Sequence, residues 1–247
     1  MQPSFFTDKN ARRSTNDAPR LCASGESAMT GKMLVFLGSE RVSGPPRPAR
    51  LGERVSAACM TRLAGKDVDA ALIDPVDIDL PHPFKPHFAY SKGKAPEAME
   101  RLAEEIESAD GYVMVSPEYN HMMSPALSDL LNHFGSSLFS YKPSAIVTYS
   151  AGQWGGTRAA VGMRTFLSEL GCLPVSAMIH VPHAQDVFAE DGGYLDGVDG
   201  ERWDGYLDRT FDQLCWWAKA AAHARHEDGA RPGAFIINPS ERDAPKS

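Results

Sequence analysis

The residues Met33-Leu-Val-Phe-Leu-Gly38 carry the clearest structural signal in this chain of 247 residues. Five consecutive apolar side chains are too few for a buried helix and are typical of a strand that is covered on both faces. Similar short apolar runs follow along the chain, and further strands are expected at residues 68–74, 112–115, 145–149 and 175–181. Strands of this kind occur in parallel sheets, so the sequence predicts a five-stranded parallel sheet.

Helical patterns separate the expected strands. Leu51, Val55, Cys59 and Leu63 recur every four residues and form an apolar stripe. Ser124 and Pro125 predict the N-cap and first residue of another helix, and Gly171 is expected to end a later one. These further helices are expected over residues 99–106, 125–138, 159–170 and 203–221. Strands that alternate with helices predict a doubly wound, three-layer α/β/α sandwich.

The two ends of the chain lack the apolar patterns of the strands and helices. Residues 1–32 are polar and lack periodicity, which predicts a disordered N-terminal extension. Their small excess of basic residues hints at a targeting segment, but a long or misassigned start explains it better. Residues 227–247 contain Pro232, Pro239 and Pro245 and are expected to be a flexible tail. Residues 33–226 are therefore expected to form one α/β domain.

Composition excludes several classes of protein. The net charge of -7 argues against nonspecific binding to nucleic acid or to an anionic membrane. The four cysteines form no CxxC or zinc spacing, so we expect neither disulfides nor a structural metal, and a reducing, cytoplasmic setting. The pairs His180/His183 and His223/His226 lack nearby acidic or thiol partners, so no metal site is expected there. No apolar run is long enough to cross a membrane.

The loops after the first, third and fourth strands are the expected ligand site, because parallel α/β sheets bind ligands outside the carboxyl ends of their strands. Residues 38–50 contain parts suited to a phosphate, namely hydroxyl groups, arginines and the start of a helix. Neither GxGxxG nor a P-loop follows the first strand, which argues against tightly bound NAD. Residues 116–124 and 150–156 can present backbone N–H groups to a flat ring such as a flavin.

Three motifs carry a resemblance to a known family. They are Gly38-Ser-Glu-Arg-Val-Ser43, Pro117-Glu-Tyr-Asn120 and Ser150-Ala-Gly-Gln-Trp-Gly-Gly-Thr-Arg-Ala159. In this order they resemble the NADPH-dependent FMN reductases, flavodoxin-like enzymes that include quinone, chromate and azo-dye reductases. The resemblance extends over roughly residues 33–182 and implies that FMN and NADPH are the cofactors.

The resemblance also implies which residues bind FMN. The first motif would hold the phosphate, with Arg47 preferred over Arg50, and the other two would lie along the isoalloxazine ring. The implied cofactor-binding residues are Ser39, Arg41, Ser43, Arg47, Pro117, Glu118, Tyr119, Asn120, His121, Ser150, Gly152, Gln153, Trp154 and Gly155. Family members often continue the second motif with Gly-Ser-Ile-Pro-Gly, whereas this chain has His121-Met-Met-Ser-Pro125 and so loses a hydroxyl at Met122. His121 is either a contact to the flavin or a substrate, or simply an exposed loop residue.

The expected activity is transfer of a hydride from NAD(P)H through FMN to a quinone, a flavin or a similar small acceptor, with no protein side chain required as catalyst. A flavodoxin-like carrier of single electrons is the alternative, and a flavin-free scaffold is a third possibility. The arginines of residues 38–50 and the Pro117–Asn120 motif favour the reductase. The family resemblance further implies a homodimer or a dimer of dimers, and no nucleic acid or membrane partner is expected.

Overall fold

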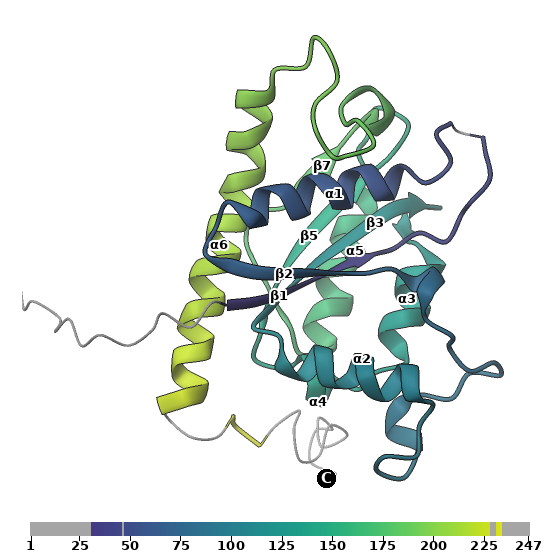
Figure 1. Ribbon diagram of the computed structural model, residues 1–247, viewed down its shortest axis with the longest axis vertical. Coiled ribbons are helices and arrows are strands. Elements are labelled where there is room, and N and C mark those ends of the chain that lie inside the picture. Colours follow the sequence, from purple (N-terminus) through teal and green to yellow (C-terminus); the bar gives the residue numbers. More distant parts are fainter. Residues whose placement is uncertain (1–30, 46, 228–230, 234–247) are drawn as a thin grey trace, which may run out of the picture.

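Strands and helices alternate along the computed structural model, which describes residues 31–45, 47–227 and 231–233 (Figure 1). The strands are β1 (Gly31–Leu37), β2 (Val68–Ile73), β3 (Gly111–Tyr119), β4 (Met122–Met123), β5 (Pro143–Tyr149), β6 (Leu173–Pro174) and β7 (Ile179–Val181). The helices are α1 (Leu51–Ala64), α2 (Glu97–Ser108), α3 (Pro125–Asn132), α4 (Ser136–Phe139), α5 (Thr157–Glu169) and α6 (Gly200–Glu227). Short 3₁₀ turns form at Pro75–Asp77, His87–Ala89 and Ala184–Asp186.

The sheet has the order β2-β1-β3-β5-β6, and β7 also pairs with β5. All of these pairings are parallel, whereas β4 forms an antiparallel hairpin with β3. The predicted doubly wound parallel sheet with five strand positions is therefore confirmed. Because β1 lies between β2 and β3, the order of the strands reverses at β1 and β3. A crevice for a ligand is expected at their carboxyl ends.

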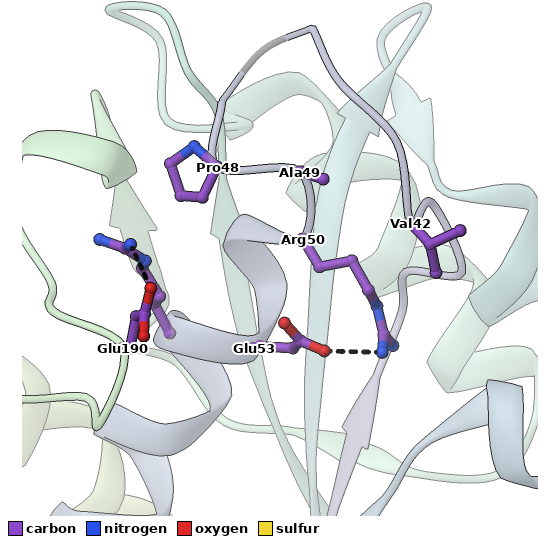
Figure 2. Close-up of a pocket in the computed structure, with 7 residues that line it drawn as sticks. Val42, Pro48, Ala49, Arg50, Glu53 and Glu190 are labelled. Atoms are coloured by element: carbon purple, nitrogen blue, oxygen red, sulfur yellow. Dashed lines mark hydrogen bonds and ion pairs between the residues drawn. The ribbon is translucent and has the colours of Figure 1, made fainter.

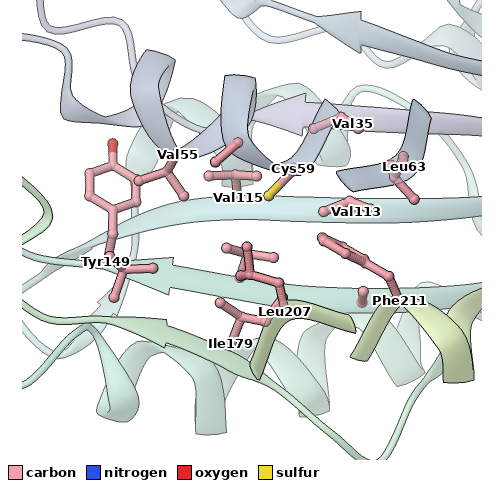
Figure 3. Packing of buried hydrophobic residues seen from close by; sticks show 14 of the residues in the cluster. Val35, Val55, Cys59, Leu63, Val113, Val115, Tyr149, Ile179, Leu207 and Phe211 are labelled. Atoms are coloured by element: carbon pink, nitrogen blue, oxygen red, sulfur yellow. The ribbon is translucent and has the colours of Figure 1, made fainter. Parts of the chain in front are cut away.

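Helices cover both faces of the sheet. In Figure 1, α1 and α6 lie on one face, and α2, α3, α4 and α5 lie on the other. Successive residues of β1 alternate between the two cores: Met33 and Val35 pack with α1 and α6, and Leu34 and Phe36 pack with the opposite helices. Figure 3 shows the first core, in which the side chains of α1 and α6 meet those of the sheet. This arrangement confirms the three-layer sandwich.

The prediction of one continuous strand over residues 175–181 was wrong. Two short strands, β6 and β7, flank an irregular segment whose backbone groups bond to side chains of the neighbouring helices. Arg164 of α5 donates to the carbonyl oxygens of Val175 (2.7 Å) and Ser176 (2.6 Å). Gln213 of α6 accepts from the N–H of Ala177 at 3.2 Å. These contacts replace strand pairing, and they depend on residues that are distant in sequence.

The single helix predicted for residues 125–138 is two helices, α3 and α4. Its expected start is confirmed, because the Ser124 hydroxyl accepts from the N–H of Leu127 at 3.1 Å and Pro125 is the first helical residue. Gly135 adopts an extended conformation between the two helices, and the ring of Phe88 lies against it. Glycine is a poor helix former, and the carbonyl oxygen of His133 accepts from the N–H of His87 at 2.7 Å, so the helix is interrupted where apolar periodicity alone would continue it.

Most of the predicted terminal segments lie outside the described residues. Gly31 and Lys32, assigned by prediction to the N-terminal extension, begin β1. In the predicted tail, Arg231 forms an ion pair with Glu107 and donates to the carbonyl oxygen of Ser137. Within the described part of the chain, no helix is long and apolar enough to cross a membrane, and no cluster of three potential metal ligands occurs.

Candidate functional site

Gly38 brings the first two candidate loops together at the end of β1. Its N–H donates to the carbonyl oxygen of Val115 in β3 at 2.7 Å. A Cβ atom at this position would lie 2.6 Å from that oxygen and 2.9 Å from the Cβ of Leu127. No side chain fits into this space, so a glycine is required for β1, β3 and α3 to approach one another.

Arg50 fixes the far end of the loop formed by residues 38–50. Its guanidinium group donates to the carbonyl oxygen of Ser39 (2.6 Å) and to the carboxylates of Asp74 and Glu53 (2.8 Å each). Its side chain is only 8% exposed. Burial alone would lower the pKa of Arg50, but the hydrogen bond and the charge of Asp74 raise it overall. Arg50 therefore holds β1, β2 and α1 together and is already occupied by protein partners.

Arg41 shapes the middle of the same loop. Its guanidinium group donates to the carbonyl oxygens of Pro45 and Ala49, whereas its buried Nε has no partner among the described residues. No described acceptor bonds to the backbone N–H groups of residues 39–44, and no side chain caps the start of α1. The inner side of the loop therefore offers several hydrogen-bond donors to an anion.

Tyr149, at the end of β5, contacts both ends of this loop. Its phenol lies beside the Ser39 hydroxyl and the first turn of α1, where a Cβ on Gly52 would be 2.5 Å from the phenolic oxygen. Burial raises the pKa of Tyr149, so the phenol is neutral at pH 7. Ser39 is itself buried, with 4% of its surface exposed. The loops after β1 and β5 are thus tied to each other through Tyr149.

A pocket of about 420 Å³ lies between this loop and the first turns of α1, and Figure 2 shows the residues that line it. Its wall contains both charge signs, since Glu53 pairs with Arg50 and Glu190 lies 3.5 Å from Arg54. The lining residues are Val42, Pro48, Ala49, Arg50, Glu53, Arg54 and Glu190. The loop therefore stands away from α1 instead of packing closely on it.

The Pro117–Asn120 motif forms part of a β-hairpin, whereas the sequence favoured a loop. Residues 117–119 extend β3, and Tyr119 is paired with Met122 of β4. Asn120 and His121 form the two-residue turn, with positive φ angles of 50° and 66°. Turns with two positive φ angles match the twist of a tight hairpin. The motif is therefore held rigidly at the carboxyl edge of the sheet.

A chain of polar contacts links this hairpin to the loop after β5. The Oε1 atom of Glu118 lies 2.8 Å from Nδ1 of His121 and 3.9 Å from the guanidinium group of Arg158. Arg158 in turn lies over the ring of Trp154, 4.9 Å from its centroid. The other carboxylate oxygen of Glu118 is buried and has no described partner. The contacts join His121, Glu118, Arg158 and Trp154 into one cluster.

The loop of residues 150–156 is closed by its own hydrogen bonds. The Ser150 hydroxyl donates to the carbonyl oxygen of Gly152 (2.8 Å) and accepts from the N–H of Gly155 (2.9 Å). Thr148 donates to the carbonyl oxygen of Gly155 and therefore accepts from Nδ1–H of His180, both at 2.8 Å. Burial lowers the pKa of His180, so its imidazole is neutral at pH 7. The tip of the loop, residues 152–154, stays exposed.

The structure therefore brings most of the predicted residues to one edge of the sheet. This geometry agrees with a comparison of the sequence with protein families, in which residues 32–186 match the model for NADPH-dependent FMN reductases. The chain belongs to the NADPH-dependent FMN reductase family. The matched segment contains all three loops described above.

Individual proteins of the same kind show similarity as well. The chain is 34% identical over 92 residues to an NADPH azoreductase of a Bacillus species, which covers 36% of this chain and 52% of that protein. It is 34% identical over 105 residues to an NAD(P)H-dependent FMN reductase of Pseudomonas aeruginosa, covering 41% and 57%. The aligned part of the chain thus spans just over half the length of each of these two relatives.

A solved structure shows the same fold. The NAD(P)H:acceptor oxidoreductase FerB of Paracoccus denitrificans matches with a TM-score of 0.56 at 21% identity, over 75% of this chain and 98% of that chain. The flavodoxin-like architecture that the motifs implied for this FMN reductase family member is therefore confirmed.

The predicted site residues of this FMN reductase family member differ in their surroundings. Ser43 and Arg47 are exposed in the first loop, whereas the Ser150 hydroxyl is bonded within its own loop. Sequence reasoning did not include Tyr149 or Asp74, although each lies at or just after the end of an expected strand. Because both residues lie at the carboxyl ends of expected strands, the sequence alone could have placed them at this edge of the sheet.

Replacing Arg50 by glutamine is expected to destabilise the protein by about 2 kcal/mol, because three charge-assisted hydrogen bonds are lost or weakened. The exposed Arg47 is the matched control, since its replacement by glutamine is expected to change stability by no more than about 0.5 kcal/mol. Urea unfolding followed by circular dichroism measures both values. Equal stability of the two variants would contradict the structural role of Arg50.

Proposed function

We propose that this protein is an FMN-dependent NAD(P)H oxidoreductase that reduces quinones, flavins or similar small acceptors. The observation that carries the proposal is the meeting of the three loops after β1, β3 and β5 where the strand order reverses, in a chain of the FMN reductase family. The names of its relatives support the same class of reaction, because they are FMN reductases, azoreductases and quinone reductases. We propose the cytoplasm as the setting, in line with the cysteine usage of the sequence.

The first loop fits the phosphate of FMN. A dianion needs several donors, and the N–H groups of residues 39–44 together with the buried Nε of Arg41 have no described acceptor. The uncapped start of α1 adds a favourable dipole. We assign Ser39, Arg41 and Ser43 to the phosphate, and favour Arg47 over Arg50 for a further contact because Arg50 is held by Asp74 and Glu53.

The hairpin and the third loop fit a flat ring. Both present rigid backbone at the carboxyl edge, and the exposed indole of Trp154 offers an aromatic face. Residues Pro117 to His121 would lie along one side of the ring, and Ser150, together with Gly152 to Gly155, would lie along the other. When bound, FMN accepts two electrons from the nicotinamide and passes them to the acceptor. The side chains then orient the ring and exclude water from part of it.

A visible spectrum of the protein, reconstituted with FMN and freed of excess flavin, tests the proposal. We expect a bound-flavin band that bleaches when NADPH is added under anaerobic conditions and returns when a quinone is supplied. A band that NADPH leaves unchanged would favour a carrier of single electrons. The absence of a bound-flavin band would refute the cofactor assignment.

Replacing Arg41 by alanine is expected to weaken FMN binding by about 1.5–3 kcal/mol, because a charge-assisted contact is lost and the first loop is released. This corresponds to an increase of roughly 10- to 150-fold in the dissociation constant. Quenching of flavin fluorescence on titration measures the effect. Unchanged affinity in a folded variant would refute the assignment of Arg41 to the phosphate site.

We also propose that the protein forms a homodimer or a dimer of dimers. Trp216 and Trp217 on α6 support this proposal, because both are large apolar side chains that are exposed (63% and 46%). Leu173, which is 50% exposed, is a further exposed apolar side chain. Light scattering at micromolar concentration tests the proposal, and a monomeric mass would refute it.

A further inference from the structure

We propose that His121, oriented by Glu118, donates a proton to the quinone or similar acceptor while the acceptor is reduced. The inference rests on the proposed function and adds a catalytic residue to it. His121 is the proton donor, and Glu118 is a positioning residue that acts through His121.

The side chains of Glu118 and His121 form a carboxylate–imidazole pair that uses only one of the two ring nitrogens. Nδ1 of His121 is 2.8 Å from Oε1 of Glu118, and the imidazole is 67% exposed whereas the carboxylate is only 12% exposed. The buried partner therefore holds one ring nitrogen and leaves Nε2 directed toward solvent or a ligand. This arrangement fixes both the orientation and the tautomer of an imidazole that transfers protons at its other nitrogen.

The backbone at His121 indicates that the side chain has a role. Its φ angle is 66°, a left-handed conformation that glycine adopts without strain and that histidine adopts at some cost. A two-residue turn of this kind strongly favours glycine at its second position. Strained residues of this type concentrate at functional sites, where the rest of the structure maintains them.

The charged groups around the pair suit a proton donor. Glu118 faces the imidazole from β3, and Arg158 of α5 lies 3.9 Å from the same carboxylate oxygen. The carboxylate therefore lies between two nitrogen-bearing side chains, the imidazole of His121 and the guanidinium group of Arg158. Tyr119 and Met122, which flank the turn in the hairpin, are 39% and 57% exposed and provide apolar surface for an aromatic acceptor.

The proton balance of the reaction requires such a donor. Conversion of a quinone to a hydroquinone adds two electrons and two protons, and a hydride brings both electrons but only one proton. The second proton must reach the other quinone oxygen, where a new O–H bond forms as the Nε2–H bond of the imidazolium breaks. The neutral imidazole then takes up a proton from water. An acceptor such as ferricyanide, which takes single electrons and no proton, does not need this step.

The replacement of His121 by glycine tests the proposal, because glycine suits the turn and keeps the hairpin folded. Quinone turnover is expected to fall by roughly 10- to 100-fold, with water taking over part of the transfer at this exposed site. Ferricyanide turnover is expected to fall much less than quinone turnover, so that the ratio of quinone to ferricyanide turnover falls, and added imidazole is expected to restore part of the quinone turnover. Full quinone turnover in the glycine variant would overturn the proposal.

A matched control separates this effect from the loss of any exposed histidine. His82 is 69% exposed and also lies beside a carboxylate, with Nε2 3.9 Å from Oδ2 of Asp129. Its replacement by glutamine is expected to leave quinone turnover unchanged. Absence of NADPH oxidation with either acceptor in the wild-type protein would refute the proposed function itself, which distinguishes that failure from failure of the proton-donor role.

Nitrogen NMR of the full chain gives a readout that does not depend on turnover. At a pH where the imidazole is neutral, we expect the proton of His121 on Nδ1, because Glu118 accepts from that atom. Replacement of Glu118 by alanine is expected to move the proton to Nε2, the atom that carries it in the favoured neutral tautomer of free histidine. The same tautomer in both proteins would overturn the positioning role of Glu118.

Discussion

Replacement of Gly156 by alanine is expected to destabilise the protein by about 3 kcal/mol. Gly156 precedes α5 and has a φ angle of +79°, which costs any other residue about 1–2 kcal/mol. An added Cβ would also lie 2.7 Å from the Cβ of Thr148 in β5. Because Thr148 holds the loop of residues 150–156 through Gly155, the strain is expected to reach the proposed flavin site as well. Chemical unfolding measures the first effect, and FMN titration measures the second.

Gly152, in the same loop, is the matched control. Its φ angle is not positive, and nothing lies within 4 Å of a Cβ built on it. Replacement of Gly152 by alanine is therefore expected to change the free energy of unfolding by no more than about 0.5 kcal/mol. If Gly156→Ala lost less than 1 kcal/mol, the close packing of the third loop on β5 would be contradicted.

Replacement of Lys142 by methionine is expected to cost about 3 kcal/mol of stability. The Lys142 ammonium group is buried and donates to three carbonyl oxygens, those of Ile106 (2.7 Å) and Glu107 (2.7 Å) in the last turn of α2, and that of Leu138 (2.9 Å) in α4. It therefore closes the carboxyl end of α2, where a positive charge is also favoured by the helix dipole. Methionine fills a similar volume but removes all three of these hydrogen bonds. The Tyr112 hydroxyl, which lies 2.8 Å from the carbonyl oxygen of Ile106 and 3.3 Å from that of Leu138, cannot replace them all, and the carbonyl oxygen of Glu107 loses its Lys142 donor.

Lys32 provides the comparison for this variant. Its ammonium group also bonds near the end of α2, to Glu105 and Ser108, but its side chain is 29% exposed and its partners can turn to water. Lys32→Met is expected to cost no more than about 1 kcal/mol in urea unfolding. Equal losses for Lys32→Met and Lys142→Met would argue against a special role for the buried ammonium group.

The stability difference between wild type and Lys142→Met is expected to depend on pH. Burial lowers the pKa of Lys142 to about 7, below the value of 10.5 for a lysine in the unfolded chain. Between these values the unfolded chain binds more protons than the folded protein, so the unfolding free energy rises with pH. The wild type is therefore expected to gain stability relative to Lys142→Met from about pH 7 to pH 10. Unfolding curves that keep a constant separation over this range would contradict the shift.

Local sequence signals were sufficient for most of the fold. The runs at Met33–Leu37 and at residues 112–115 and 145–149 are buried strands. Four or five apolar residues in a row are typical of a strand in a parallel sheet, since helices cover both faces of such a sheet. Ser124 with Pro125 also marked a helix start correctly. The errors came at residues 133–138 and 175–181, where His87, Arg164 and Gln213 form hydrogen bonds from other parts of the chain.

The position of the candidate site could be predicted from the sequence, but the roles of its individual side chains could not. Its three loops follow the carboxyl ends of buried strands, so their meeting at one edge follows from a parallel sheet. The roles of the arginines could not be predicted, because the folded structure decides which carboxylates and carbonyl oxygens bond to each guanidinium group. Arg50 is taken by Asp74, which is 24 residues away in sequence, and Arg158 lies near Glu118.

The sequence by itself determined the layers, the parallel sheet, the family and the edge of the sheet proposed for the ligand site, because these depend on short apolar runs and on motifs whose meaning is local. Only the tertiary structure decided that Pro117 to Tyr119 form a strand, that Asn120 and His121 turn a hairpin, and that Glu118 holds the imidazole. Hydrogen bonding between side chains depends on distances of a few ångströms between distant segments. Those distances are set by how the helices pack on the sheet, and no local pattern of residues encodes them.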